Sequence, residues 1–328
     1  MKLGIAGAGK IVAEFLSLKD EVKGLEVQAI YARNNRDGKL DEFCKRYHIA
    51  QKYTNYDEML RSDQIDTVYV AVVNDVHYEF CKKALEGGKH VICEKPFTVN
   101  VKQLEELCQI AKEKHLMLIE AITVLYMPYY RKIQEQIALL GKIKIVECNY
   151  SQYSSRYDAF KRGEILPAFD VKRAGGALMD LNIYNVHFVT GLFGKPQEVH
   201  YYANIEQKID VSGMLILTYP SFQCVCIGAK DCAAPVVSNI QGDRGCIHLE
   251  QPTNFCTAFQ KIMNKQAVEN YDFDENRHRM YYEFVKMTEM IDSGNYEEAG
   301  KRLAHSRIAL QVLTEARKSA GIVFLGDE

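Results

Sequence analysis

The sequence lacks an excess of either charge. Its 41 Lys and Arg residues nearly balance 43 Asp and Glu residues, which gives a formal net charge of −2, and no long run carries one sign. Nucleic acids and anionic membranes select strongly basic surfaces, so neither is an expected partner. We expect a small-molecule partner instead.

Long apolar runs and paired cysteines are also missing. No run approaches the ~18 residues of a membrane-spanning helix, and no signal-peptide pattern precedes the first expected strand. The ten cysteines form no CxxC pair, and their scatter resembles neither a zinc site nor a disulfide framework. We therefore expect a soluble protein of the reducing cytoplasm, without a metal site.

The first part of the chain alternates short apolar runs with amphipathic segments. This alternation predicts βαβ units and a parallel sheet. The expected strands are residues 3–7, 27–32, 65–72, 90–93 and 116–121. The expected helices are residues 10–22, 39–48, 77–88 and 100–115, which carry apolar residues at three- and four-residue spacing.

Strands dominate after about residue 123. They are expected at 143–153, 198–205, 212–219, 222–229 and 245–250, with helices at 176–193, 276–294 and 296–320. Few helices separate these strands, which favours a mostly antiparallel sheet. We predict an α/β domain over residues 1–122 and an α+β domain over 123–328, with a substrate cleft at their junction.

A glycine pair stands where the first expected strand turns into a helix. In a dinucleotide-binding turn, one glycine permits the tight turn and another lets the backbone approach the pyrophosphate, which the helix N-terminus binds. Val12 replaces the usual third glycine, and the alternative is an ordinary turn that binds no nucleotide. The predicted cofactor contacts are Gly7, Ala8, Gly9, Lys10 and Ile11.

The end of the second strand bears on the choice between NAD and NADP. An NAD site usually places an acidic residue about 20 residues after the glycines, to bind the ribose 2′-hydroxyl. This chain has Arg33 and Arg36 there, and no acid before Asp37. A guanidinium can pair with a 2′-phosphate, so the sequence favours NADP, with NAD also possible. The alternative is that Arg33 is simply a solvated loop residue.

The expected strand 90–93 ends in two opposite charges, Glu94 and Lys95, followed by Pro96. Strands of a parallel sheet are buried on both faces, and charges are rare there. Ligands of such sheets bind outside the carboxyl ends of the strands, so we expect both charges to face a cleft. Pro96 favours an extended conformation at Lys95 and helps to aim its side chain.

Three segments together resemble the Gfo/Idh/MocA family of NAD(P)-dependent oxidoreductases. They are GAGKIV at 7–12, VVNDVHYEFCKKALEGGKHVICEKP at 72–96 and GGALMDLNIYNVHFVTGLFG at 175–194. The resemblance implies a doubly wound Rossmann domain followed by an α+β domain with a large open sheet. It also implies a homodimer or homotetramer formed through that sheet, and hydride transfer on sugars, polyols, inositols or related diols.

The resemblance also implies roles for single residues. Lys95 matches a lysine near nicotinamide and substrate, and Glu94 matches a glutamate that contacts the cofactor. Asn74 and His77 match positions that line the cofactor site, although Val73 replaces the usual preceding proline. For His77, a structural role at the start of a helix is the alternative.

The expected helix 176–193 carries Asp180, Tyr184 and His187 at spacings of four and three, so the three can share one face. Many family members have a proton-donating histidine four positions after the aspartate. Here that position is Tyr184, as in a subset resembling glucose–fructose oxidoreductase and dimeric dihydrodiol dehydrogenase.

Oxidation of an alcohol needs a base for the hydroxyl proton, and reduction needs an acid that returns it. A tyrosine with an ordinary pKa near ~10 is a poor base at neutral pH, and a nearby lysine cation favours its phenolate. We predict Tyr184 as the acid/base and Lys95 as its electrostatic partner and binder of the substrate oxygen. Asp180 would orient the substrate hydroxyl, and His187 would contact the substrate.

Several alternatives remain open from the sequence. Tyr184 and His187 can be core residues, and Lys95 can exchange the proton itself. Leu125 and Met127 stand where the family often has polar substrate contacts. This replacement motivates a second hypothesis, a dinucleotide-binding sensor without catalysis. A third hypothesis is elimination driven by a tightly held NAD, as in glycoside-cleaving relatives.

Overall fold

The structure of this chain, a computed structural model, describes residues 1–327 and divides them into two units. The first unit combines residues 1–121 with 280–306, and the second combines 122–279 with the chain from Arg307 onward. The sequence predicted two consecutive blocks, whereas residues 280–306 return to the first unit. Aromatic packing explains this return, because the Phe284 ring lies 4.1 Å from Phe15 and 5.2 Å from Tyr69, centroid to centroid.

Six parallel strands form the sheet of the first unit, in the order β3-β2-β1-β4-β5-β6. The side chains of its inner strands, such as Ile5, Val68 and Ile92, are completely buried. The strands are β1 (Lys2–Ala6), β2 (Glu26–Tyr31), β3 (Gln51–Tyr53), β4 (Thr67–Val70), β5 (His90–Glu94) and β6 (Leu118–Ala121). The predicted parallel sheet is confirmed, and only the short β3 was missed.

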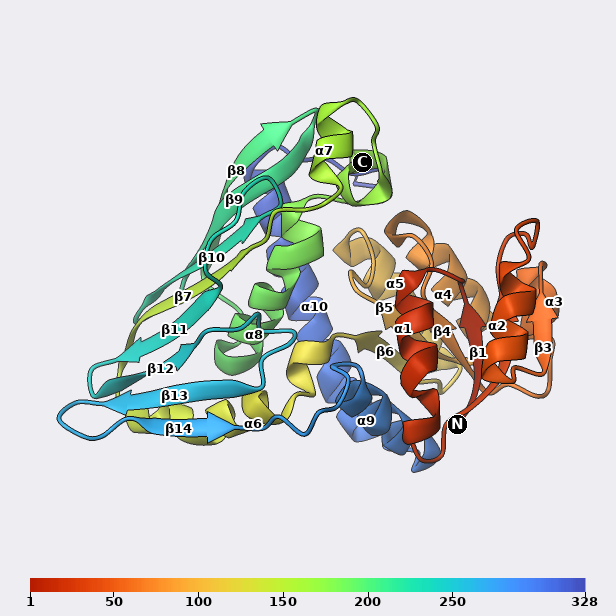
Figure 1. Cartoon of the computed structure of the whole chain (residues 1–328), viewed down its shortest axis with the longest axis horizontal. Coiled ribbons are helices and arrows are strands. Elements are labelled where there is room, and N and C mark those ends of the chain that lie inside the picture. The colour runs from red at the N-terminus through yellow and green to blue at the C-terminus, as the bar shows by residue number, and fades with distance from the viewer. Residues whose placement is uncertain (328) are drawn as a thin grey trace. The chain divides into compact units, whose positions relative to one another are not determined.

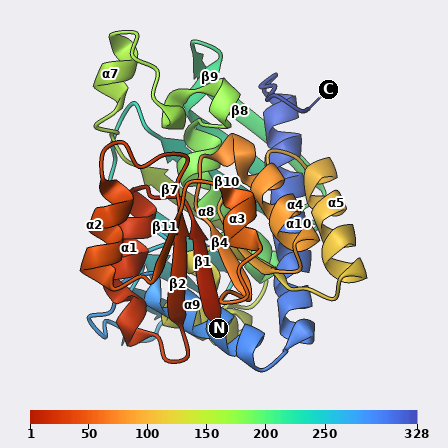
Figure 2. The ribbon, with the colours of Figure 1, turned by 90° about the vertical axis from the view of Figure 1, so that its right-hand side faces the viewer.

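Helices cover both faces of this sheet. Figure 2 shows α1 and α2 on one side of the strands and α4 and α5 on the other. The helices are α1 (Lys10–Leu18), α2 (Lys39–Tyr47), α3 (Tyr56–Leu60), α4 (His77–Glu86), α5 (Val101–Glu113) and α9 (Tyr281–Asp292). Two-sided coverage explains why the inner strands β1, β4 and β5 are mostly buried, since neither face meets water.

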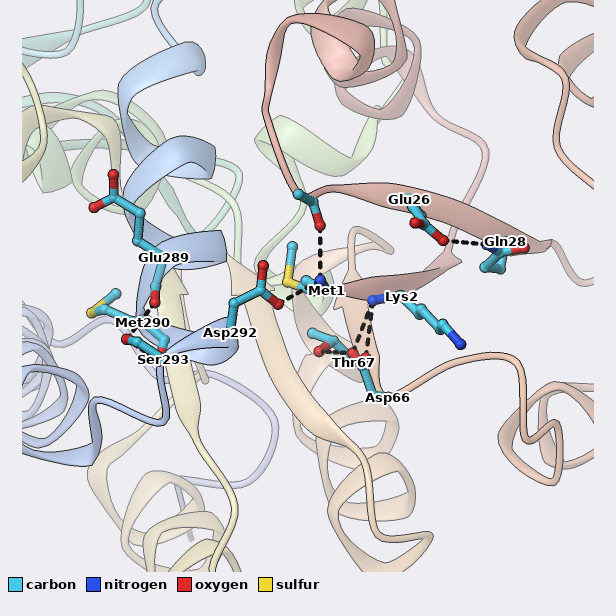
Figure 3. Close-up of polar contacts among 11 residues, drawn as sticks. Met1, Lys2, Glu26, Gln28, Asp66, Thr67, Glu289, Met290, Asp292 and Ser293 are labelled. Atoms are coloured by element: carbon cyan, nitrogen blue, oxygen red, sulfur yellow. Dashed lines mark hydrogen bonds and ion pairs between the residues drawn. The ribbon is translucent and has the colours of Figure 1, made fainter.

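The amino end of β1 is tied to α9 by polar contacts (Figure 3). The Met1 amine donates to the Gly24 carbonyl at 2.8 Å and to Asp292 Oδ1 at 2.5 Å. The Lys2 amide donates to both carboxylate oxygens of Asp66, at 3.0 and 3.1 Å. The contact between Met1 and Asp292 joins α9 to the amino end of β1, whereas the glycine turn follows the carboxyl end of this strand.

Eight strands form the sheet of the second unit, in the order β14-β13-β12-β11-β7-β10-β9-β8. All neighbours are antiparallel except β7 and β10, so the predicted mostly antiparallel sheet is confirmed. The strands are β7 (Ile143–Ser151), β8 (Glu198–Glu206), β9 (Ile209–Thr218), β10 (Gln223–Ala229), β11 (Val237–Gly242), β12 (Gly245–Leu249), β13 (Ala258–Met263) and β14 (Glu269–Asp272). The sequence reading missed β11, β13 and β14.

Helix α8 lies against one face of this second sheet (Figure 1). A π-helical turn, Leu178–Asn182, leads directly into it. The helices of this unit are α6 (Pro128–Gln136), α7 (Tyr157–Lys161) and α8 (Ile183–Phe193), while α10 (Tyr296–Ser319) is shared between the two units. No helix within residues 1–327 has the length and apolar character needed to cross a membrane.

Candidate active site

Gly7 makes the turn between β1 and α1 possible. Its φ of +128° suits glycine, and a Cβ there would meet the Ala71 carbonyl oxygen at 2.2 Å. Its amide donates to the Tyr31 carbonyl at 2.8 Å. The turn is therefore closed against β2 and against the residue that follows β4, and only glycine fits.

Gly9 differs, because a Cβ there would meet nothing within 4 Å. It is the N-cap of α1, where no side chain caps the helix and no acidic residue occupies the first turn. The neighbouring Lys10 side chain is 85% exposed. Open space beside the positive end of an uncapped helix fits a pyrophosphate, so residues 7–11 are suited to hold the implied dinucleotide.

The segment after β2 presents the arginines predicted to select NADP. Arg33 is exposed and makes no hydrogen bond or ion pair with the residues that the structure describes. Asp41, a nearby acid, pairs with Lys52 and accepts a hydrogen bond from the Asn35 amide at 2.6 Å. The hydrogen bond from Lys52 lowers the pKa of Asp41. This acid is thus already engaged by neighbouring side chains.

Glu94 is the last residue of β5, and its carboxylate accepts a hydrogen bond from the Tyr69 hydroxyl of β4. Tyr69 is completely buried, so this hydrogen bond fixes the position of the carboxylate. Lys95 follows, half-buried, and its peptide bond to Pro96 is cis. The structure therefore places both charges at the carboxyl end of β5, as the sequence predicted for a parallel strand.

His77 begins α4, and its side chain has no exposed surface. Its ring nitrogens lie 2.9 Å from the Pro96 carbonyl and 3.1 Å from the Val72 carbonyl. Burial lowers the pKa of His77. The resemblance implied that this side chain lines the cofactor site. These contacts join the segment after β4 to the turn that follows Lys95, and contact with the cofactor stays a prediction. Asn74 is half-buried.

The second unit carries the other predicted residues on and before α8. The Asp180 side chain is 36% exposed, whereas Tyr184 and His187 are 7% and 1% exposed. The Tyr150 ring lies 6.3 Å from the Tyr184 ring, centroid to centroid. Asp180 belongs to the π-helical turn and Tyr184 to α8. The prediction of one regular helix over residues 176–193 is therefore wrong at its start.

Polar side chains hold this helix to the sheet. The Asn182 amide donates to the Cys226 carbonyl at 2.9 Å, and the Asn185 amide donates to the Ile227 carbonyl at 3.2 Å. A Cβ on Gly228 would meet Asn182 Cβ at 2.8 Å, so glycine allows this close approach. The start of α8 is therefore positioned by β10 rather than by helix geometry alone.

Two charged residues that the sequence reading missed complete this region. Asp210 accepts hydrogen bonds from the Leu178 amide at 2.6 Å and the Tyr201 hydroxyl at 2.8 Å, and burial raises the pKa of Asp210 to about 6. The Lys230 ammonium donates to Asp180 Oδ2 at 2.8 Å. The only signal for Lys230 was a charge at the end of the apolar segment 222–229.

Met127 occupies one of the positions where the family often has a polar residue. Its side chain is 3% exposed and belongs to the core of the described structure, while Leu125 is half-buried. Among residues 1–327, no cluster of three or more His, Cys, Asp and Glu side chains could hold a metal ion.

Family models match both units of the chain. The model described as the oxidoreductase family with an NAD-binding Rossmann fold matches residues 1–122, and that of the GFO/IDH/MocA C-terminal domain matches 130–248. The chain belongs to the Gfo/Idh/MocA family. The predicted resemblance is confirmed, as is the predicted class of NAD(P)-dependent oxidoreductase.

Individual members of the Gfo/Idh/MocA family match over nearly the full chain. Scyllo-inositol 2-dehydrogenase (NADP(+)) IolU of Bacillus subtilis (strain 168) is 30% identical, over 100% of this chain and 99% of the relative. Trans-1,2-dihydrobenzene-1,2-diol dehydrogenase of Mus musculus is 26% identical, over 100% and 99%. The 3-ketoreductase KijD10 of Actinomadura kijaniata, solved with TDP-benzene and NADP, has a TM-score of 0.83 at 20% identity, covering 97% of both chains. This likeness confirms the predicted fold.

The two glycines of the turn are predicted to respond differently to alanine. Gly9→Ala should leave the melting temperature nearly unchanged but weaken NADPH binding at least ~10-fold, because the added methyl group enters the space proposed for the pyrophosphate. Gly7→Ala should destabilise the fold by roughly 2 kcal/mol or more, through the clash with Ala71.

Thermal unfolding and NADPH fluorescence titration measure the two effects. Gly88→Ala is the control for backbone strain alone, since Gly88 has φ +76° and open space around it. Normal NADPH affinity in Gly9→Ala would contradict the assignment of this turn to the cofactor.

Proposed function

We propose that this protein transfers hydride between NADP and a secondary alcohol or carbonyl carbon of a sugar, polyol, inositol or trans-diol. The observation that carries the proposal is the shared position of the uncapped α1 N-terminus and the Glu94–Lys95 pair, both at carboxyl ends of strands in one parallel sheet. The printed activities of the two curated relatives, on an inositol and on a trans-diol, support the substrate class.

Different residues of the chain would bind different parts of the cofactor. Residues 7–11 would hold the pyrophosphate, Arg33 the 2′-phosphate, and Glu94 and Asn74 the nicotinamide end. Bound NADP would accept or supply the hydride. Tyr69 supports this arrangement by holding the Glu94 carboxylate, and His77 supports it by holding the Pro96 carbonyl.

Alcohol oxidation and ketone reduction both need a group that exchanges the hydroxyl proton. We propose that Lys95 binds the substrate oxygen and favours the phenolate of Tyr184, which takes or returns the hydroxyl proton. Asp180 would accept a hydrogen bond from the substrate hydroxyl and set its orientation, and His187 would contact the substrate. In this scheme Lys95 belongs to the cofactor-binding domain but contacts the substrate, whereas the three residues on and before α8 serve the substrate alone.

A non-catalytic dinucleotide sensor is the second candidate. The apolar residues Leu125 and Met127 favour it, because they remove polar groups that the family often uses. The retained Lys95 and Tyr184 favour catalysis, because binding alone needs neither an acid nor a base. Elimination with a tightly held NAD stays a third possibility, and a cytoplasmic location stays a prediction from the sequence.

Turnover separates these functions. Purified protein is mixed with NADP⁺ or NADPH and a panel of inositols, sugars, polyols, trans-diols and their ketones, and reduced-nicotinamide absorbance is followed. Lys95→Met and Tyr184→Phe should each lower kcat by about 10²- to 10⁴-fold, because proton transfer and charge stabilisation are lost. NADPH affinity should persist in Tyr184→Phe.

Tyr153→Phe is the matched control, because Tyr153 is 42% exposed and bonds only locally to Asp158 and Lys161 among the described contacts. Absence of turnover across the panel, together with intact NADPH binding, would favour the sensor. Full activity of Tyr184→Phe would remove this residue from the mechanism. Bound NAD that survives purification without net turnover would instead favour elimination.

Cofactor preference depends on Arg33 in this proposal. Arg33→Ala should weaken NADPH binding by about 10- to 100-fold and leave NADH binding unchanged, because a charge-assisted hydrogen bond to the 2′-phosphate is removed. Arg61→Ala, also exposed but outside the segment that follows β2, is the control. Tighter binding of NADH than of NADPH to the unmodified protein would overturn the preference.

We further propose that the open face of the second sheet joins two copies of the chain, in a dimer or within a tetramer. Tyr202 and Met214 face each other across β8 and β9 and are 58% and 50% exposed. Ile145 on β7, by the strand register, shares their face and is 48% exposed. Exposed apolar side chains on one face of a sheet are typical of an interaction surface.

Met214→Glu should convert the assembly to monomers, because an added carboxylate would be buried in the interface. Size-exclusion chromatography with light scattering at several protein concentrations measures the change. Phe255→Glu replaces another exposed apolar residue, 51% exposed, and should keep the assembly. A monomeric unmodified protein at ~10 μM would refute this assignment.

A further inference from the structure

Lys230 follows β10, and hydrogen bonds of its backbone amide and carbonyl fix its position. Its amide donates to the Val211 carbonyl at 2.8 Å, and its carbonyl accepts from the Ser154 amide at 2.8 Å. The side chain is 2% exposed. A lysine buried to this extent is uncommon, and its charge needs nearby partners.

Three contacts surround the ammonium group. It donates to the Ala168 carbonyl at 2.6 Å and to Asp180 Oδ2 at 2.8 Å. It also lies 4.3 Å from the centroid of the Phe169 ring, within the range of a cation–π interaction. The carbonyl and the ring hold the ammonium independently of Asp180, so the position of this charge does not rely on the carboxylate.

The same carbonyl connects Lys230 to the glycines before the π-helical turn. Ala168 accepts a hydrogen bond from the Gly176 amide at 3.1 Å, in addition to the one from Lys230. A Cβ on Gly175 would meet the Pro167 carbonyl oxygen at 2.6 Å, so the chain passes close to this segment. The backbone leading to Asp180 and the ammonium that binds its side chain therefore share one support.

Asp180 lies in a π-helical turn, and its side chain is 36% exposed, so packing restrains it on only part of its surface. A charge-assisted hydrogen bond to a buried lysine selects one orientation and favours the carboxylate. Holding a group in place before the substrate arrives lowers the entropic part of the barrier.

We propose that Lys230 is a positioning residue of the active site, whose buried ammonium holds the Asp180 carboxylate oriented toward the substrate hydroxyl. This inference rests on the proposed function, and specifically on the role of Asp180 in it. Lys230 acts through Asp180 and does not touch the substrate. The proposal distinguishes it from a lysine that merely stabilises the fold.

Lys230→Met tests the proposal, because methionine keeps the apolar stem and removes the charge. The expected result is a kcat about 10- to 100-fold lower, with NADPH affinity within about twofold of the unmodified protein. Lys261→Met is the matched control. Lys261 is 7% exposed in the same sheet and pairs with Glu269 at 2.9 Å, so the same kind of buried ion pair is removed away from Asp180.

The pairing with Asp180 is tested by combining the substitutions. In an Asp180→Asn background, Lys230→Met should lower kcat by less than about twofold, because the group it positions is already altered. An equal loss of kcat in both backgrounds would show that Lys230 does not act through Asp180. Lys230→Gln keeps a hydrogen-bond donor without charge, and it takes the place of Lys230→Met if that variant does not fold.

These measurements distinguish a failure of the proposed function from a failure of the role assigned to Lys230. If the unmodified protein turns over no member of the substrate panel, the proposed function and this inference both fall. If it is active, and Lys230→Met or Lys230→Gln retains full kcat, only the inference falls. A loss of thermal stability with unchanged kcat, equal to that of Lys261→Met, would assign Lys230 a purely structural role.

Discussion

Parallel pairing of the six strands in the first unit is the constraint from which its chemistry follows. Because all neighbouring strands run in one direction, their carboxyl ends meet at one edge. Gly7, Arg33 and Lys95 each follow a different strand of this sheet, so residues far apart in sequence reach the same edge. The strands themselves are buried on both faces, which leaves their ends as the places where charge is tolerated.

In the second unit, the polar groups are carried by one helix that packs against a mostly antiparallel sheet. Its irregular start is held by contacts from neighbouring strands rather than by regular helical bonding. Asp210 binds the Leu178 amide, Asn182 binds the β10 backbone, and Lys230 binds Asp180. These three buried side chains each have a hydrogen-bond partner, which is the condition for keeping such groups inside a folded domain.

In each unit a lysine follows the end of a strand, but the two lysines differ in burial. Lys95 follows β5 and stays half-buried, whereas Lys230 follows β10 and is buried against a carbonyl, a ring and a carboxylate. In both cases an apolar strand is followed by a charged side chain, which is costly to bury without partners. The sequence shows this boundary equally well for both lysines. Only the surrounding fold decides how deeply each lysine is buried.

The sequence by itself determined the features that depend on local patterns. Periodicity predicted most strands and helices, and the spacing of Gly7, Gly9 and the Glu94–Lys95 pair pointed to a dinucleotide fold and its family. Tertiary structure decided the long-range partners: the return of residues 280–306 to the first unit, the burial of His77, and the Asp180–Lys230 pair. Those two residues are 50 positions apart. Strand register and packing bring such groups together, and neither is encoded in the spacing of nearby residues.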